Sequence, residues 1–350
     1  MPSLLRLLGF ALAIVALALA VWIGRRGGNR SLVLPLVVSG IGLLVVVLFP
    51  DGIRFIQGVI GLGGEPAGGI ITTLMIALGF AYLLLFYVLA KSERQTQRLG
   101  RLIRALSAAQ LEVEDMVPRR GGILVVVPAW NEAESLPAII AAIPGEIHGL
   151  RTQVLVVDDA SRDATRRVAL DAGARVVTQP VNAGQGAALQ TGYLVAERVG
   201  VDIVVTMDAD GQHDPAQIER LVGPIVGDEA DFVVGSRREG DYDREAGAGG
   251  AARDAGITVL TKLINLLGGT SVSDAANGFR AIRANRLAEI AFTEDQFHNP
   301  ELLIGAARSG LRIAEVPITV RRRVAGKSKK GGTLRYGLGF LRVVIRTWLR

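Results

Sequence analysis

The sequence predicts an α/β domain with a mostly parallel sheet, preceded by an all-α membrane region. From residue 122 onward, short β-branched runs alternate with alanine-rich helical stretches, which is the pattern of βαβ units. Before residue 91, three stretches carry no charged side chain, at 7–24, 31–50 and 66–90. Each is close to the ~20 residues that a helix needs to cross a ~30 Å hydrocarbon layer.

The composition agrees with this division and excludes several classes of protein. Half of the 350 residues are apolar and 21% are charged, below the ~25% of a typical soluble chain. The absence of cysteine excludes disulfides, thiolate metal sites and cysteine nucleophiles. The net charge of +6 is concentrated at one end, because residues 321–350 hold ten basic and no acidic residues. A nucleic-acid partner is therefore not predicted.

The basic residues of the loops predict the orientation of the membrane helices. Segment 25–30 contains three arginines, and segment 91–104 contains five basic residues, whereas loop 51–65 has one arginine against two acidic residues. Cytoplasmic loops carry the excess of Arg and Lys. We therefore expect a multi-pass protein of the plasma or inner membrane, with everything after residue 90 in the cytoplasm.

Changes in composition divide the chain into four segments. Leucine and isoleucine repeat at helical spacing over residues 99–106, and Pro118 with two following glycines ends that helix. The expected segments are a three-helix transmembrane domain (1–90), a cytoplasmic helical stalk (91–118), the α/β domain (119–325) and a basic amphipathic interfacial tail (326–350).

The tail is expected to form an amphipathic helix. Its apolar side chains at helical spacing are Leu334, Leu338, Leu341, Ile345 and Trp348. Arginines occupy another stripe, and seventeen residues reach only ~25 Å at ~1.5 Å per residue. We expect this helix to lie in the cytoplasmic membrane interface. Packing against the α/β domain is the alternative.

Polar residues follow the predicted strands, where ligands bind in parallel sheets. They are Asn131 and Glu132 after the first strand, Asp158 and Asp159 after the second, Asp208 and Asp210 after the fourth, and Ser236 and Arg237 after the fifth. Asp159 suits a hydrogen bond to a base or ribose. Either Ser161 or Asp163 caps the next helix. The glycine-bearing turn at 182–193 serves either a ligand or close helix–sheet packing.

The sharpest motif is Asp208-Ala209-Asp210. Residues i and i+2 of an extended chain face the same side, and two carboxylates suit a divalent cation shared with a diphosphate. A solvated acidic turn is the alternative, although Asp214-Pro215 already supplies the cap of the following helix. Gln212 is a further candidate ligand, and His213 is expected to be an exposed loop histidine.

Seven segments occur in the order typical of one enzyme family. They are VVVPAWNEAESL, VLVVDDASRDAT, NAGQGAALQTGY, VVTMDADGQHDP, VVGSRR, DAANGFRAI and EVPITVRRRVAGKSK. Together they resemble the family 2 glycosyltransferases with the GT-A fold, and within them the dolichol- or polyprenyl-phosphate sugar synthases. The resemblance covers roughly residues 120–330. The N-terminal helices are similar to a small membrane domain found beside such enzymes.

Four features depart from the family pattern. Asn277 stands where the family often has serine, and Trp130 replaces a common tyrosine. The membrane helices precede the catalytic domain, whereas well-known relatives have them after it. The missing QxxRW segment argues against a processive polysaccharide synthase.

The resemblance implies roles residue by residue. The nucleoside would be held by Pro128, Trp130, Glu132, Val157 and Asp159. The rest of the donor would meet Asp208, Ala209, Arg237, Arg323 and Lys329. Mg²⁺ or Mn²⁺ would be held by Asp208, Asp210 and Gln212. The acceptor phosphate would bind Arg280, Arg321 and Arg322. The catalytic residues would be Asp210, Asp274 and Arg323.

The implied reaction is that of an inverting hexosyltransferase in the membrane. It moves a sugar from a nucleoside-diphosphate sugar to a dolichyl or undecaprenyl phosphate. A phosphate is already an anionic nucleophile and needs no strong base. The alternatives are a lipid or glycan hydroxyl acceptor, for which Asp274 would be the base, and a non-catalytic nucleotide-sugar scaffold. Homo-oligomerisation, the sugar, the nucleoside and the lipid length stay open.

Several charged residues have structural alternatives. Asp274 orients the acceptor, acts as base or pairs with Arg280. The arginines at 321–323 and Arg280 would also attract anionic lipid headgroups, and the family pattern favours the site for Arg323. Glu301 is expected to be a favourable charge at a helix start.

Overall fold

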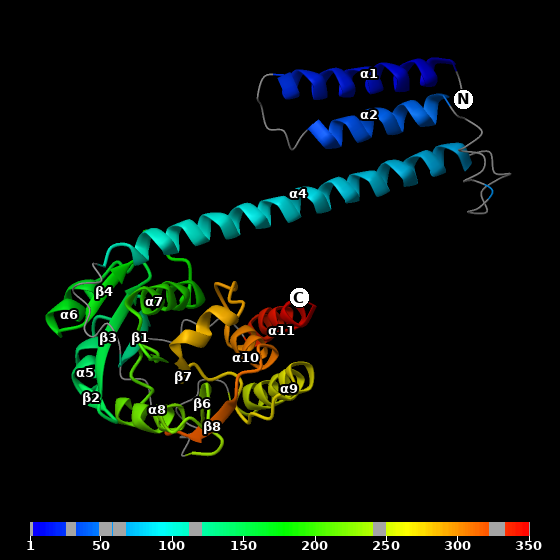
Figure 1. The fold of residues 1–350 in the computed structure, drawn as a ribbon. Coiled ribbons are helices and arrows are strands. Elements are labelled where there is room, and N and C mark those ends of the chain that lie inside the picture. The colour runs from blue at the N-terminus through cyan, green and yellow to red at the C-terminus, as the bar shows by residue number, and fades with distance from the viewer. Residues whose placement is uncertain are drawn as a thin grey trace. The chain divides into compact units, whose positions relative to one another are not determined.

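The computed structural model describes residues 3–25, 33–48, 58, 68–111, 121–240, 250–321 and 333–349. The chain forms two compact units, Met1–Thr96 and Gln97–Arg350. Helix α4 (Gly68–Ala108) runs without interruption through the third uncharged stretch and most of the expected stalk (Figure 1).

The first unit contains the helix pair α1 (Ser3–Arg25) and α2 (Val33–Leu48), which pack side by side (Figure 1). The two helices approach closely because small residues lie between them. A Cβ atom at Gly40 would lie 2.6 Å from Leu17 Cγ, and Ala13 and Ala20 are buried. Within the described parts of the chain, no helix combines the length and apolar character needed to cross a membrane. The expected transmembrane helices are therefore not confirmed.

The second unit is built on one mixed sheet with the strand order β2-β3-β1-β5-β7-β6-β8, in which β4 also pairs with β3. The strands are β1 (Gly122–Ala129), β2 (Glu146–Ile147), β3 (Leu150–Asp158), β4 (Arg175–Thr178), β5 (Ile203–Thr206), β6 (Phe232–Ser236), β7 (Arg280–Arg283) and β8 (Ile313–Pro317). Strands β1, β3, β4 and β5 are parallel, and β8 is parallel to β6. Strand β7 runs antiparallel to both β5 and β6. The predicted α/β class with a mostly parallel sheet is confirmed.

Helices cover both faces of this sheet (Figure 1). They are α5 (Leu136–Ala142), α6 (Thr165–Asp171) and α8 (Ile218–Val226) on one face, and α7 (Gln185–Val199), α9 (Gly250–Gly268), α10 (Asn299–Arg308) and α11 (Thr333–Leu349) on the other, with short 3-10 turns η3 (Pro215–Gln217) and η5 (Ala284–Glu289). Alternate residues of β1 enter the two cores, Leu124 and Val126 on the α7 side and Val125 on the α5 side. This alternation explains why the strand is apolar throughout.

The C-terminal part of α4 shows its apolar stripe to solvent. Leu99, Leu102 and Leu106 are each at least 60% exposed. The opposite face packs on the α/β core, because Ala108 is buried there and Arg104 donates to Asp295 Oδ1 at 3.0 Å. The stalk residues therefore contact the domain through Arg104, Ala108 and the partly buried Leu111.

Helix α11 packs against α9 and α10 (Figure 1). Phe340, Val343 and Val344 are buried, and Arg308 of α10 donates to the backbone carbonyls at the end of α11. Ile345 is 45% exposed and lies on the outward side. Packing on the domain, the expected alternative, is thus observed for residues 333–349, and the interfacial location stays a prediction.

Candidate functional site

One edge of the sheet gathers most of the predicted site. Because β7 is antiparallel to β5 and β6, its amino end lies beside their carboxyl ends. The described residues brought to this edge come from six separate strand ends: Trp130 and Glu132, Asp159, Asp208 and Asp210, Arg237, Asp274 and Arg280, and Arg321. The predicted residues Arg322, Arg323 and Lys329 lie outside the described residues.

The Asp208-Ala209-Asp210 turn begins where β5 ends. Asp208 Oδ1 accepts a hydrogen bond from Gln185 Nε2 at 2.6 Å, and Asp210 Oδ1 accepts one from the backbone N–H of Gln212 at 3.0 Å. The buried hydroxyl of Ser135 donates to the carbonyl of Ala209 at 2.6 Å. The turn is therefore held from the first strand loop as well as from its own backbone.

The donor set of this turn suits a hard cation that also binds a diphosphate. Among the described residues, no cluster of three or more acidic or histidine side chains could hold a metal ion. Mg²⁺ is usually bound by one or two carboxylates, waters and substrate phosphates, so Asp208 and Asp210 fit that role. The side-chain amide nitrogen of Gln212 lies 3.5 Å from the carbonyl of Arg321, so this side chain is turned toward the segment that follows β8.

His213 is buried, so the expectation of an exposed loop histidine was wrong. Its Nδ1 accepts the backbone N–H of Asp208 at 3.3 Å, and its Nε2 lies 3.1 Å from Asn277 Oδ1. An accepting Nδ1 places the proton on Nε2. The ring stacks on Phe279 with centroids 4.8 Å apart. Asn277, the residue that departs from the family pattern, therefore makes two contacts with its side-chain amide. Its Oδ1 lies beside His213, and its Nδ2 donates to the carbonyl of Gly235 at 2.6 Å.

The predicted nucleoside residues lie at the ends of β1 and β3. Pro128 and Val157 are buried partners in the parallel pair, and Trp130 is 38% exposed just beyond them. The backbone N–H of Glu132 donates to Thr165 Oγ1 at 2.9 Å. The first two strand loops thus support one another.

The N-cap position of α6 is Ala164, which has no capping side chain, and of the two candidate caps it is Asp163 that bonds to the first helical residue. Its carboxylate accepts the backbone N–H of Thr165 at 3.0 Å. Ser161 instead accepts the backbone N–H of Asn131 at 2.9 Å.

Asp159 holds the turn before α7. Its two carboxylate oxygens accept the backbone N–H groups of Ala183 and Gly184, each at 2.8 Å. Burial raises the pKa of this carboxyl, and the two hydrogen bonds offset part of that effect. The sequence did not indicate that Asp159 would bond to the backbone at residues 183 and 184. Its nucleoside role stays a prediction.

The glycines of the 182–193 turn serve close packing. A Cβ atom at Gly186 would lie 2.7 Å from the carbonyl oxygen of Asp295, and one at Gly192 would overlap Val126. Gly184 has φ +100°, a conformation that favours glycine. The packing alternative for this turn is therefore supported.

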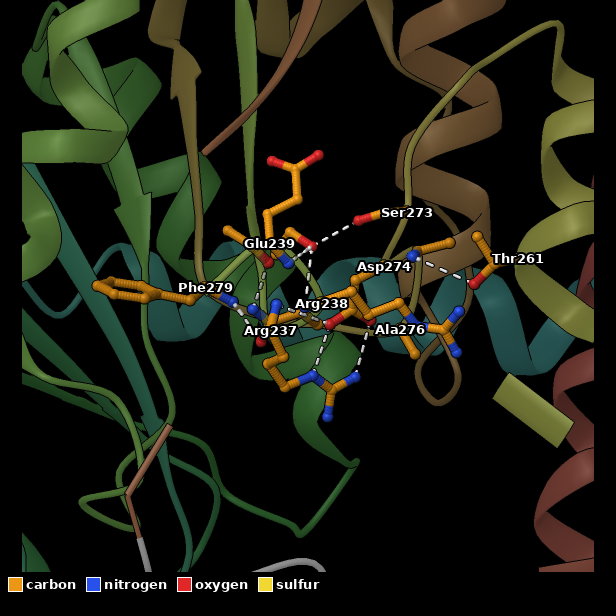
Figure 2. A network of polar contacts seen from close by, with 12 residues as sticks. Arg237, Arg238, Glu239, Thr261, Ser273, Asp274, Ala276 and Phe279 are labelled. Atoms are coloured by element: carbon orange, nitrogen blue, oxygen red, sulfur yellow. Dashed lines mark hydrogen bonds and ion pairs between the residues drawn. The ribbon is translucent and has the colours of Figure 1, made fainter. Parts of the chain in front are cut away.

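Asp274 pairs with Arg237 and not with Arg280 (Figure 2). Its oxygens accept from Arg237 Nε at 2.5 Å and from Nη2 at 2.8 Å. Asp274 is 1% exposed, and burial opposes its ionisation. The hydrogen bonds and charge of Arg237 outweigh this and lower the pKa of the carboxyl. A carboxylate with a lowered pKa that is engaged on both oxygens is a weak general base.

Arg280 is a structural residue, which corrects its predicted place on the acceptor phosphate. It is 1% exposed, and its guanidinium donates to the carbonyls of Asn277, Asn299 and Ala275. Burial lowers its pKa to about 10. A phosphate could reach this group only if the surrounding backbone opened. Arg321, in contrast, is exposed and pairs with Asp214 at 2.7 Å.

Glu301 lies in the first turn of α10, as expected, but it is also fully buried. Its carboxylate accepts the backbone N–H groups of Thr293 and Glu294 and the hydroxyl of Thr293, at 2.8 to 2.9 Å. It therefore fixes the loop against which the start of α7 packs. The sequence pattern identified the negative charge of Glu301 at a helix start. It did not indicate the bond to Thr293, eight residues earlier in the chain.

Residues 124–290 match the family described as glycosyl transferase family 2. The chain is also 33% identical over 227 residues to the undecaprenyl-phosphate mannosyltransferase of Micrococcus luteus, covering 60% of this chain and 88% of that protein. The chain belongs to glycosyl transferase family 2. The predicted enzyme class, a glycosyltransferase, is thereby confirmed.

Two further relatives show a similar degree of identity. The polyprenol monophosphomannose synthase of Mycolicibacterium smegmatis is 33% identical, with 60% of this chain and 81% of that protein covered. The dolichyl-phosphate hexose transferase of Haloferax volcanii is 33% identical, with 59% and 86% covered.

A solved structure of glucosyl-3-phosphoglycerate synthase from Mycobacterium tuberculosis, in complex with Mg²⁺ and UDP, shares the fold. Its TM-score is 0.51 at 26% identity, and 65% of this chain and 78% of that chain are covered. The expectation of a GT-A-like domain is confirmed by this likeness.

Proposed function

We propose that this chain transfers a hexose from a nucleoside-diphosphate sugar to a polyprenyl phosphate. The observation that carries the proposal is the Asp208–Asp210 turn at the same sheet edge as the Arg237–Asp274 pair. The two carboxylates of the turn suit a cation bound to the leaving diphosphate. The arginine of the pair suits a phosphate of the acceptor. Relatives named for transfer to undecaprenyl, polyprenol and dolichyl phosphates support the acceptor class.

On the donor side, Pro128, Trp130, Glu132 and Val157 would contact the nucleoside, with Asp159 shaping the adjoining turn. Asp208 and Asp210 would hold Mg²⁺ or Mn²⁺, with the backbone of Ala209 and Gln212 beside them. A bound cation stabilises the negative charge that develops on the leaving diphosphate. Related solved enzymes in complex with Mg²⁺ or Mn²⁺ and UDP support this assignment.

On the acceptor side, the residues present fit a phosphate better than a hydroxyl. The guanidinium of Arg237 donates two hydrogen bonds to Asp274, and these bonds orient it. A planar guanidinium suits phosphate oxygens. Asp274 has a lowered pKa, so it is poorly suited to the base role that a hydroxyl acceptor needs. Arg321, Arg322, Arg323 and Lys329 would supply further positive charge.

The proposed reaction is a single displacement with inversion. A phosphate oxygen of the acceptor forms a bond to the anomeric carbon on one face. The bond to the diphosphate oxygen breaks on the opposite face, and the electron pair leaves with the diphosphate. Arg237, which the resemblance placed on the donor, would in this proposal hold the attacking phosphate, and Asp208 and Asp210 would act on the departing group.

We also propose a multi-pass location in the plasma or inner membrane, with the catalytic unit on the cytoplasmic face. The uncharged stretches at 7–24, 31–50 and 66–90 support it, and so does the exposed Ile345 of α11. A reporter fused after Leu106 should be cytoplasmic, and one in loop 51–65 should be external. Both reporters on the same side would overturn this topology.

The decisive experiment supplies membranes containing the full chain with a panel of radiolabelled nucleotide sugars and a short-chain polyprenyl phosphate. We expect one donor to label an extractable lipid that releases its sugar in mild acid, as a glycosyl phosphate ester does. An acid-stable labelled lipid would point to a hydroxyl acceptor. No transfer from any donor would favour the scaffold alternative.

A further inference from the structure

Gln185, the first residue of α7, contacts the candidate metal site from outside the Asp208-Ala209-Asp210 turn. Its side-chain Nε2 donates to Asp208 Oδ1 at 2.6 Å. The two residues are 23 positions apart, so this contact exists only in the folded domain. Gln185 belongs to none of the residue groups that the family resemblance implies.

The backbone of Gln185 is anchored on both sides. On one side, the Asp159 carboxylate accepts the backbone N–H groups of Ala183 and Gly184 at 2.8 Å. On the other, the backbone N–H of Gly186 donates to the carbonyl of Asp295 at 2.8 Å. With its neighbours held in this way, the glutamine side chain leaves the backbone at a defined point and direction.

The Asp208 carboxylate is also confined by the backbone of Gly278. A Cβ atom at Gly278 would lie 3.3 Å from Asp208 Oδ1 and 3.8 Å from Oδ2, so the carboxylate lies close to the backbone of this glycine. Thr206 Oγ1 donates to the carbonyl of Gly278 at 2.7 Å and fixes that backbone. The Oδ1 atom of Asp208 therefore accepts from an amide donor and also lies close to a fixed glycine.

The chemistry of the partner suits a metal ligand. An amide orients a carboxylate by hydrogen bonding and, unlike a lysine or arginine, adds no positive charge that would repel a cation. Groups that hydrogen-bond to ligating carboxylates orient them, and their loss typically lowers metal affinity or activity by ~10–100-fold.

We propose that Gln185 is a positioning residue that holds the Asp208 carboxylate in the orientation that binds the divalent cation. The inference rests on the proposed function, because the cation is the one shared with the donor's diphosphate. Gln185 acts through Asp208 and takes no part in bond making or breaking.

The test is the affinity of the full chain for Mn²⁺, measured by electron paramagnetic resonance of the free ion without nucleotide. Gln185→Met keeps the length of the side chain and removes the donor, and we expect ~10-fold or greater weakening. Gln185→Lys adds a positive charge beside the cation and should weaken binding further. Gln185 is exposed, so both variants should keep the melting temperature of the parent chain.

The matched control is Gln110→Met. Gln110 is an exposed glutamine whose amide donates to the carbonyl of Thr178 at 2.9 Å, so its loss should leave Mn²⁺ affinity unchanged. In sugar transfer, Gln185→Met should need ~10-fold more Mn²⁺ for half-maximal rate and recover turnover at saturating Mn²⁺.

Equal Mn²⁺ affinity and equal Mn²⁺ dependence in Gln185→Met and the parent chain would overturn the positioning role alone. A parent chain that neither binds Mn²⁺ nor transfers sugar would overturn the proposed function as well.

Discussion

Two aspartates at the same sheet edge accept hydrogen bonds from side chains of different charge, one neutral and one positive. Asp208, after β5, accepts from the neutral amide of Gln185. Asp274, before β7, accepts twice from the guanidinium of Arg237. The amide of Gln185 adds no charge of its own beside Asp208, whereas the guanidinium of Arg237 balances the charge of Asp274. Asp208 and Asp274 are the same residue type at the same sheet edge. We therefore expect the charge of the neighbouring donor to influence what each carboxylate can bind.

The largest expected effect is on the cation side of this comparison. Asp208→Asn or Asp210→Asn should lower turnover by ~10²-fold or more, because the leaving diphosphate loses its charge stabilisation. EDTA should abolish transfer, and Mg²⁺ or Mn²⁺ should restore it. Full activity of the parent chain in EDTA would show that neither carboxylate serves a cation.

The next effect concerns the arginine side. Arg237→Gln should lower turnover by more than ~10-fold, since it removes a charged donor to phosphate. Asp274→Asn should cost about 10-fold through misplacement of Arg237, which is less than the ~10²–10⁴ that loss of a general base brings. If Asp274 acts only through Arg237, the double variant should be no slower than Arg237→Gln. If instead Asp274→Asn is inactive and the double variant is slower than Arg237→Gln, Asp274 acts as a base and the acceptor is a hydroxyl.

The same pair predicts a pH dependence of stability. The pKa of Asp274 is lowered in the folded chain, so its contribution is present above the unfolded value of ~3.9 and is lost as the pH falls through the folded pKa. The difference in unfolding free energy between the parent chain and Asp274→Asn should be constant from about pH 5 to 8 and shrink below about pH 4. A difference that shrinks between about pH 5 and 8 would mean that the carboxyl titrates there.

A smaller effect is expected at Gly278, which lies close to the same Asp208 oxygen that accepts from Gln185. An added methyl group would lie 3.3 Å from Asp208 Oδ1, so the carboxylate must shift by a few tenths of an ångström. Gly278→Ala should raise the Mn²⁺ concentration for half-maximal rate by less than the ~10-fold expected for loss of the Gln185 donor. An unchanged Mn²⁺ requirement would show that Gly278 does not confine Asp208.

The smallest effect is on stability at Arg321. Its ion pair with Asp214 is exposed, with 65% of the arginine side chain accessible, and such pairs contribute ~1 kcal/mol or less. Arg321→Ala should therefore leave the urea midpoint of unfolding nearly unchanged. A clear fall in transfer rate without a change in that midpoint would assign the arginine to phosphate binding.

Local pattern was enough to predict much of the fold and part of the site. The alternation of β-branched and alanine-rich segments predicted the mostly parallel sheet, because side-chain periodicity is set within a few residues. The Asp208-Ala209-Asp210 turn was found for the same reason, since a strand and the turn that ends it are contiguous. Of the two candidate caps of α6, two residues apart, Asp163 bonds to the first helical residue, although the N-cap position itself is Ala164.

The sequence by itself determined the strands β1, β3, β4, β5 and β6, their order along the chain and the polar residues at their ends, but not β2, β7 or β8. Only the tertiary structure decided the partners of those residues. The antiparallel β7 brings Asn277 to His213 and buries that histidine. Asp274 meets Arg237, while Arg280 enters the core. Gln185 reaches Asp208 from another helix. Each pairing joins residues at least 23 positions apart, and hydrogen bonds across such distances depend on how the chain folds back, which residue spacing does not encode.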